Sequence, residues 1–214
     1  MHKVDYTLTY VTDHSITNDT AFFKILEDAL KGGASIIQLR EKSCSTLSFY
    51  NRALKAKTRC HAYRVPLIIN DRIDIALAID ADGVHIGQTD MPYSKARELL
   101  GTTKIIGLSI SNTEQAIEAE NLKVDYIGIS PIFNTATKTS DLAPSLGIQG
   151  LKMIRPLFSK PIVCIGGIHK KNVADIMRNG ANGVAVISAI SKAEYPEKET
   201  KTLKKIICQT GLIQ

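Results

Sequence analysis

The segment 38-QLREK-42 places two cations, Arg40 and Lys42, on alternate positions directly after an apolar run. The run, 34-ASIIQL-39, has the length and composition of a buried strand. The pair could simply mark the point where a strand reaches water, or both side chains could face the same anion. Arginine offers a planar fork that suits phosphate, and lysine offers a compact charge. The second interpretation predicts an anion site at the end of this strand.

Two carboxylates and a third cation follow other apolar runs in the same way. Asp71 and Asp90 come after two successive runs, and Lys138 comes after a later one. Two carboxylates, together with water and phosphate oxygens, make a usual Mg²⁺ site. Taken singly, each carboxylate could cap a helix or form a salt bridge, and Asp71 could be the N-cap of a helix over 72–80. Taken with the three cations, the pair indicates a diphosphate bound beside Mg²⁺.

A second anion pocket is predicted later in the chain. Gly166, Gly167 and Ser188 follow the last two apolar runs, where barrels often bind a phosphate through main-chain N–H groups. The glycines could alternatively serve only a tight turn. The segment 131–147 is the longest expected loop, and a loop of that length is more often a lid or a binding loop than filler. Two pockets indicate two phosphorylated substrates, or one substrate with phosphates at both ends.

Short apolar runs, which alternate with helix-period segments, must position these residues. The runs are rich in Val and Ile and mostly continuous, as in parallel strands that are covered on both faces. They cover 6–11, 35–39, 67–70, 83–86, 105–109, 125–130, 161–165 and 183–187. Helices are expected over 19–31, 45–63, 113–122, 170–179 and 197–209. Ser45 is a candidate N-cap, and Ala116, Ile117 and Ala119 are candidate core positions of the third of these helices.

Eight strand candidates, each followed by a helix candidate, predict a compact (β/α)₈ TIM barrel with a single domain over 1–214. In such a barrel the active site lies at the C-terminal ends of the strands, where the polar residues above are found. A doubly wound open sheet is the alternative. The absence of GxGxxG after the first strand, and of a Walker loop anywhere, disfavours it.

Composition excludes several classes of protein. The chain has 214 residues, of which 44% are hydrophobic, and no apolar run approaches the ~20 residues that a membrane span needs. The N-terminus lacks a secretory pattern, so we expect a cytoplasmic protein. The net charge is +6, but basic residues in 192–205 are mixed with Glu, which favours a solvated helix face over a nucleic-acid site. Four scattered cysteines without a CxxC pair predict reduced thiols and no zinc site; Cys164 is expected in the core.

These motifs, in this order, resemble the thiamine phosphate synthase family. The similarity extends from the first strand to 188-SAIS-191. It rests on the segments 38-QLREK-42, 69-INDRIDIA-76, 83-GVHIGQTD-90, 126-YIGISPIFNTATK-138 and 162-IVCIGGI-168. The resemblance implies a (β/α)₈ barrel that joins a hydroxymethylpyrimidine diphosphate to a hydroxyethylthiazole phosphate and releases pyrophosphate. Asn134 departs from the proline that the family usually has at that position.

The resemblance also implies the roles of individual residues. The pyrimidine diphosphate would contact Gln38, Leu39, Arg40, Glu41, Lys42, Asn70, Ser109 and Lys138, of which Arg40, Lys42, Lys138 and Ser109 would be catalytic. The thiazole phosphate would contact Thr135, Ala136, Thr137, Gly167, Ile187 and Ser188, and Asp71 and Asp90 would hold Mg²⁺. The expected mechanism is dissociative and needs no general base. His85 is accordingly expected in the core or behind the site, and His169 at the surface.

Three other functions remain open at this point. A thiazole tautomerase shares the barrel but uses a His near the loop that follows the sixth strand, where this chain has Pro131. A non-catalytic binder of thiamine phosphate would not need either carboxylate. A nucleic-acid binder would show a strongly salt-dependent affinity. We expect small-molecule substrates, no membrane or nucleic-acid partner, and self-association as an additional possibility.

Overall fold

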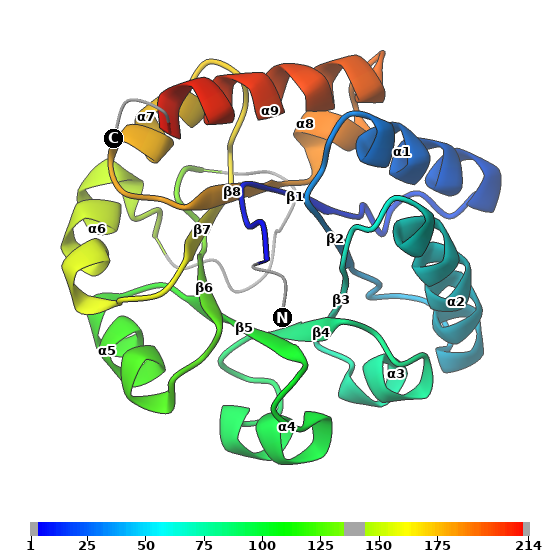
Figure 1. The fold of residues 1–214 in the computed structure, drawn as a ribbon, viewed down its shortest axis with the longest axis horizontal. Coiled ribbons are helices and arrows are strands. Elements are labelled where there is room, and N and C mark those ends of the chain that lie inside the picture. Colours follow the sequence, from blue (N-terminus) through cyan, green and yellow to red (C-terminus); the bar gives the residue numbers. More distant parts are fainter. Residues whose placement is uncertain (1–3, 135–143, 212–214) are drawn as a thin grey trace.

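The computed structural model describes residues 4–134 and 144–211 and contains eight parallel strands that form a closed barrel (Figure 1). Each strand pairs with its neighbour in sequence, and β1 pairs with β8. The strands are β1 (Leu8–Val11), β2 (Ile36–Leu39), β3 (Leu67–Asn70), β4 (Gly83–Ile86), β5 (Ile105–Ile110), β6 (Tyr126–Ile129), β7 (Ile162–Ile165) and β8 (Gly183–Val186). The predicted barrel is therefore confirmed, and the open sheet is excluded.

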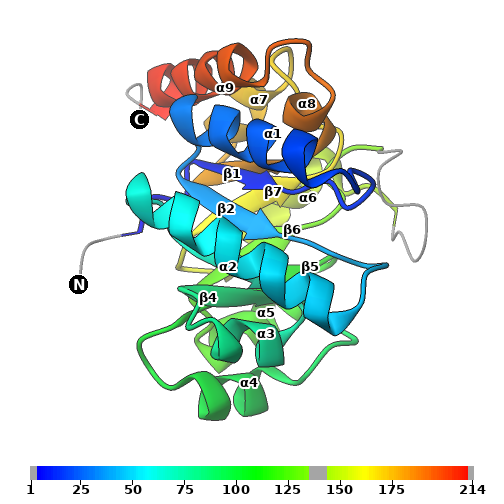
Figure 2. The ribbon, with the colours of Figure 1, turned by 90° about the vertical axis from the view of Figure 1, so that its right-hand side faces the viewer.

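Helices surround the barrel on its outside (Figures 1 and 2). They are α1 (Asp19–Lys31), α2 (Thr46–Ala62), α3 (Ile73–Ala78), α4 (Tyr93–Leu100), α5 (Thr113–Leu122), α6 (Gly147–Ile154), α7 (Val173–Arg178), α8 (Ser188–Ser191) and α9 (Pro196–Gly211), with a 3₁₀ turn η1 at Arg155–Leu157. No helix in the described part of the chain is long and apolar enough to cross a membrane.

Most of the expected helix signals are confirmed. Ser45 caps α2, since its side chain accepts a hydrogen bond from the main-chain N–H of Ser48. The helix α5 starts at Thr113, and Asn112 caps it in the same way. The prediction that Ile117 is a core residue is wrong, because 48% of its surface is exposed. The apolar stripe of α5 is narrow, so the small residues at 116 and 119 alone face the barrel.

Two apolar clusters stabilise the fold. The larger one fills the layer between strands and helices and includes Leu8, Leu39 and Cys164, which confirms the core position of that thiol. The smaller one lies inside the barrel and is built around Tyr126 and Val163. Side chains alternate along each strand, so residues that do not face the helices point into the barrel. The polar residues Gln38, Asn70, His85 and Ser109 occupy such inward positions near the strand ends, where they can reach a substrate.

Candidate active site

The segment after β2 carries a guanidinium group, that of Arg40, which has no acceptor among the described residues. The main-chain N–H of Arg40 donates to Thr12 Oγ1 at 2.9 Å, which holds the backbone against the end of β1. The Arg40 side chain makes no hydrogen bond or ion pair within residues 4–134 and 144–211. Burial lowers the pKa of Arg40, whereas the charges of Asp71, Asp13 and Glu41 raise it. The group is half-buried, cationic and available to an anion.

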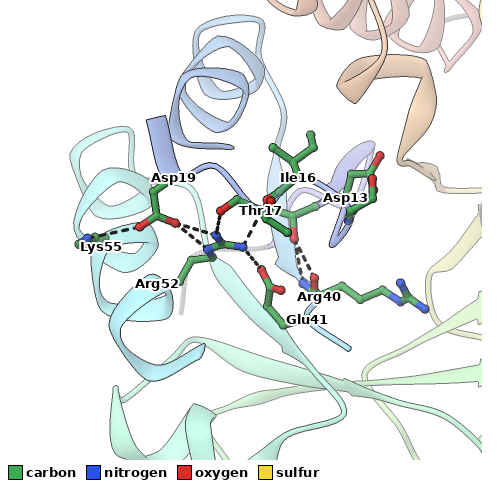
Figure 3. A network of polar contacts seen from close by, with 10 residues as sticks. Asp13, Ile16, Thr17, Asp19, Arg40, Glu41, Arg52 and Lys55 are labelled. Carbon is green, nitrogen blue, oxygen red and sulfur yellow. Dashed lines mark hydrogen bonds and ion pairs between the residues drawn. The ribbon is translucent and has the colours of Figure 1, made fainter. Parts of the chain in front are cut away.

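The two residues that follow Arg40 point in different directions. Glu41 turns away from the strand ends and forms an ion pair with Arg52 at 2.7 Å, and its side chain is only 3% exposed. Figure 3 shows the Arg40 side chain directed away from that pair. Lys42 forms an ion pair with Asp71 at the end of β3. Glu41 was predicted to contact the pyrimidine diphosphate, but its carboxylate is paired with Arg52 and is directed away from the Arg40 side chain.

The two candidate metal ligands lie next to each other after β3 and β4. Asp71 adopts a left-handed backbone conformation with φ 62°, and such residues cluster at functional sites. Asp90 Oδ2 accepts the main-chain N–H of Gly87 at 2.7 Å. Burial raises the pKa of Asp90, and Asp71 raises it further through its charge and through a hydrogen bond between the two side chains. Asp71 does not cap α3, because the capping position is Arg72, which makes no side-chain cap hydrogen bond.

A buried polar network crosses the barrel beneath these groups. His85 contacts Tyr126 Oη through Nδ1 and Ser109 Oγ through Nε2, both at 2.8 Å. Burial raises the pKa of the Tyr126 hydroxyl, and a hydrogen bond with the Gln38 side chain lowers that pKa by a smaller amount. Burial lowers the pKa of His85 to about 4, so the imidazole is neutral at pH 7. The lack of a side chain at Gly128 makes room for this ring, since a Cβ there would lie 2.9 Å from its Cε1.

The tautomer of His85 sets the donor directions along this network. With the ring proton on Nε2, the Tyr126 O–H donates to Nδ1 and Nε2 donates to Ser109 Oγ; with the proton on Nδ1, both directions are reversed. In the first tautomer the proton of the Ser109 hydroxyl can donate to a ligand at the strand ends. His85 is thus a supporting residue behind the site, as expected.

The loop that follows β6 lies directly on the turn that follows β7. Phe133 N donates to Gly166 O at 3.2 Å, so main-chain groups join the two segments. Gly167 has φ 62°, and a Cβ there would lie 2.6 Å from Asn134 O. The glycine therefore serves both the turn and the close approach of the neighbouring loop.

The second expected anion pocket contains main-chain donors beside an apolar wall. The N–H groups of Gly167 and Ser188 donate to no acceptor within the described ranges 4–134 and 144–211. Ile187 packs on the apolar cluster inside the barrel and precedes the first turn of α8. Ser191 Oγ, in that turn, donates to Asp13 Oδ2 at 3.0 Å and so ties α8 to the loop after β1.

The structure brings most of the predicted residues to one end of the barrel. Gln38, Arg40, Lys42, Asn70, Asp71, Asp90, Ser109, Gly167, Ile187 and Ser188 all lie at or just beyond the C-terminal ends of the strands. The predicted residues Thr135, Ala136, Thr137 and Lys138 lie outside the described part of the chain. Leu39 packs into the core outside the barrel, so it can offer a ligand only its main chain. His169 is exposed, as expected.

Sequence reasoning missed three residues that support this site: Thr12, Arg52 and Tyr126. Gly107 and Gly128 on β5 and β6 were the available signal for Tyr126, because glycine inside a strand often marks the close approach of another group. A Cβ at Gly107 would lie 2.1 Å from the Tyr126 ring. Arg52 had no signal, because nothing in the sequence tells a helix arginine that reaches another loop from one that faces water.

Comparisons with known proteins decide the family. The family model described as thiamine monophosphate synthase matches residues 8–190. The chain belongs to the thiamine monophosphate synthase family. The thiamine-phosphate synthase of Clostridium acetobutylicum is 47% identical over 207 residues, which are 97% of each chain. That of Clostridium novyi is 47% identical and is matched over 95% of this chain and 99% of its own.

A solved structure of the same family supports the barrel. The thiamine phosphate pyrophosphorylase of Pyrococcus furiosus superimposes with a TM-score of 0.87 at 35% identity, covering 97% of this chain and 98% of its own. Membership in the thiamine monophosphate synthase family makes this protein a transferase of thiamine biosynthesis. Its activity is the synthesis of thiamine phosphate.

Proposed function

We propose that the pyrimidine diphosphate binds at the ends of β2, β3 and β4, with its diphosphate facing Arg40 and Lys42. The observation that carries this proposal is the Arg40 guanidinium, which is half-buried and has no acceptor in the described part of the protein. Desolvating a cation without a partner is costly, so such a group is best accounted for by an anionic ligand. When the diphosphate binds, the Lys42 ammonium would leave Asp71 to pair with the diphosphate, or would contact both groups.

The residues at this end of the barrel fit Mg²⁺. Asp71 and Asp90 are adjacent carboxylates. Burial raises the pKa of Asp90 most, and the charge of Asp71 raises it further; a divalent cation would offset both effects. The described residues contain no cluster of three or more His, Cys, Asp or Glu ligands. One or two carboxylates are nevertheless the usual protein contribution to Mg²⁺ that also binds substrate phosphates. When bound, Mg²⁺ would neutralise charge that develops on the pyrophosphate leaving group.

The proposed reaction is dissociative. The C–O bond between the pyrimidine methylene and the diphosphate breaks, and its electron pair leaves with pyrophosphate. Arg40, Lys42 and Ser109 donate to the oxygens on which negative charge grows. The nitrogen lone pair of the thiazole then forms the new C–N bond at the methylene carbon. No proton is transferred, so the reaction needs no general base, and the neutral His85 is not required to act as one.

We propose that the thiazole phosphate binds at the ends of β7 and β8. The unpaired N–H groups of Gly167 and Ser188 support this placement, because main-chain donors of this kind suit a phosphate group. Ile187 would supply an apolar wall for the thiazole ring. Thr135, Ala136, Thr137 and Lys138 would complete the two sites from the loop after β6.

Product formation tests this proposal. Purified protein is mixed with both substrates in the presence of Mg²⁺ or EDTA, and thiamine phosphate is detected by chromatography. We expect product only with Mg²⁺, and a loss of about 10²–10³ in kcat for Arg40→Ala and Asp71→Ala. Arg178→Ala, an exposed position on α7, is the control and should retain activity. Near-normal turnover of either site variant would refute the assignment, and no product from folded wild-type protein would favour the tautomerase or the binder.

The setting of the enzyme is also a proposal. Cys44, Cys60, Cys164 and Cys208 are all free thiols, as is usual in a reducing compartment, so we propose that the protein works in the cytoplasm. Its partners would be the two small substrates rather than a nucleic acid or a membrane. Self-association stays a prediction that the molecular mass in solution would test.

A further inference from the structure

Arg52, on α2, contacts two separate segments at this end of the barrel: the stretch from the loop after β1 to the start of α1, and the segment after β2 (Figure 3). Its Nη1 donates to Glu41 Oε1 at 2.7 Å, and at 3.5 Å to Ile16 O in the loop after β1. Its Nη2 donates to Thr17 O at 3.0 Å and to Asp19 Oδ1 at 2.6 Å, and Nε donates to the same oxygen at 3.0 Å. All three guanidinium nitrogens are therefore engaged, and their partners lie after β1, after β2 and at the start of α1.

The contact between Arg52 and Glu41 differs from an ordinary surface ion pair. The Arg52 side chain is 13% exposed and that of Glu41 is 3% exposed. The guanidinium carbon of Arg52 lies 4.5 Å from the centre of the Phe22 ring, which covers one face of the group. Exposed pairs contribute little, but a buried carboxylate that loses its cation is strongly disfavoured. Glu41 is therefore fixed in place as long as Arg52 is present.

Fixing Glu41 also fixes its two neighbours. The strand β2 ends at Leu39 and α2 starts at Thr46, so the intervening segment has no ladder or helix of its own. Glu41 is the second residue of this segment and lies between Arg40 and Lys42 in the sequence. Its side chain points toward Arg52, while that of Arg40 points the opposite way (Figure 3). The backbone at Glu41 thus helps to place the cations of Arg40 and Lys42, together with the contacts of Arg40 N with Thr12 and of Lys42 with Asp71.

We propose that Arg52 is a positioning residue for diphosphate binding, which acts by anchoring Glu41 and thereby holding Arg40 and Lys42 toward the leaving group. The inference rests on the proposed role of those two cations. Arg52 does not touch the substrate itself, because its nitrogens are already bound to the loops and to α1.

The same helix supplies a matched control. Arg59 lies two turns after Arg52, pairs with Glu27 of α1 at 3.0 Å, and places its guanidinium carbon 4.2 Å from the centre of the Phe23 ring. It therefore repeats the link between α2 and α1 but makes no contact with the segment after β2. A loss that is specific to Arg52 cannot be ascribed to loosening of the two helices.

The experiment measures binding of inorganic pyrophosphate with Mg²⁺ by calorimetry, together with KM for each substrate and stability in urea. We expect Arg52→Gln to weaken pyrophosphate binding and raise KM for the pyrimidine diphosphate about tenfold or more, with KM for the thiazole phosphate within about twofold of wild type. Arg59→Gln should lose stability but bind pyrophosphate normally. Wild-type affinity in Arg52→Gln, or an equal loss in Arg59→Gln, would overturn the inference.

Glu41→Gln provides a second arm, which also serves if Arg52→Gln does not fold. Removing a negative charge beside Arg40 would by itself strengthen binding of an anion. The proposal predicts the opposite sign, a severalfold weaker affinity for pyrophosphate, because the contact that anchors Glu41 is weakened; tighter or unchanged binding would contradict it.

Arg40→Gln distinguishes failure of the diphosphate site from failure of the positioning role of Arg52. If this variant binds pyrophosphate normally, the assignment of the diphosphate site fails, whereas a loss there without a loss in Arg52→Gln refutes the positioning role alone.

Discussion

Replacing Tyr126 with phenylalanine removes a single oxygen atom from the middle of the buried network. That oxygen is hydrogen-bonded to Gln38 and to His85 Nδ1, which lies 2.8 Å away. Both partners are buried. The substitution keeps the ring, its packing against the cluster inside the barrel and the space that Gly107 provides for it.

The expected loss of stability follows from the two hydrogen bonds. Each is worth about 1 kcal/mol net, and a buried donor or acceptor that is left unpaired costs on the order of 1–3 kcal/mol. We therefore expect a decrease of about 2 kcal/mol in the free energy of unfolding. For a chain of this size, each kcal/mol lowers Tm by about 2–4 °C, so Tm should fall by roughly 4–8 °C.

Urea denaturation at neutral pH, followed by far-UV circular dichroism, measures this difference. Tyr6→Phe is the matched control, because the Tyr6 ring packs against Tyr126 with the two ring centroids 5.0 Å apart. The Tyr6 hydroxyl makes no hydrogen bond within residues 4–134 and 144–211, so its removal should change stability by no more than about 0.5 kcal/mol. Equal effects of the two substitutions would refute the network as described, since only one of the two hydroxyls is bonded.

Two further outcomes are expected. The pKa of His85 is about 4 in the folded state and about 6.5 in the unfolded state, so between these pH values the folded protein binds fewer protons than the unfolded one. The stability that depends on the neutral ring is therefore present above pH 6.5, and the free energy of unfolding should fall by about 2 kcal/mol by pH 5. Urea unfolding of His85→Gln at the same pH values should not show this decrease. Gly167→Ala should lower the melting temperature more than Gly101→Ala, although both glycines have a positive φ. A Cβ at Gly167 would lie 2.6 Å from a main-chain oxygen, whereas nothing lies within 4 Å of a Cβ at Gly101. Thermal melts of the two variants would show this difference, and equal losses would mean that backbone strain alone matters.

The barrel itself was predictable because its signals are local. Continuous apolar runs of Val and Ile such as 67-LIIN-70 give parallel strands, and caps such as Ser45 give the starts of helices. The positions of Arg40, Asp71 and Asp90 at the strand ends followed from topology alone, because every strand of such a barrel ends on the same side.

The supporting contacts were not predictable because they join segments that are distant in sequence. The pairing of Glu41 with Arg52 depends on the orientation of a helix relative to a loop, and the contact of His85 with Tyr126 spans 41 positions. The error at Ile117 has the opposite origin: a local apolar pattern suggested burial, but the barrel needs only the small residues on that face of α5.

The closure of the barrel by β1 and β8 has a consequence for the order in which the site is made. Asp13 and Ser191, which join the first loop to α8, are 178 positions apart. During synthesis the edge of β1 that faces β8 stays unpaired until residue 186 has left the ribosome. Most of the groups proposed for the leaving group, from Gln38 to Ser109, are translated before residue 110, whereas the ends of β7 and β8 come last. The half that would hold the electrophile thus emerges first, and it becomes part of a finished enzyme only when the final strand returns to the first.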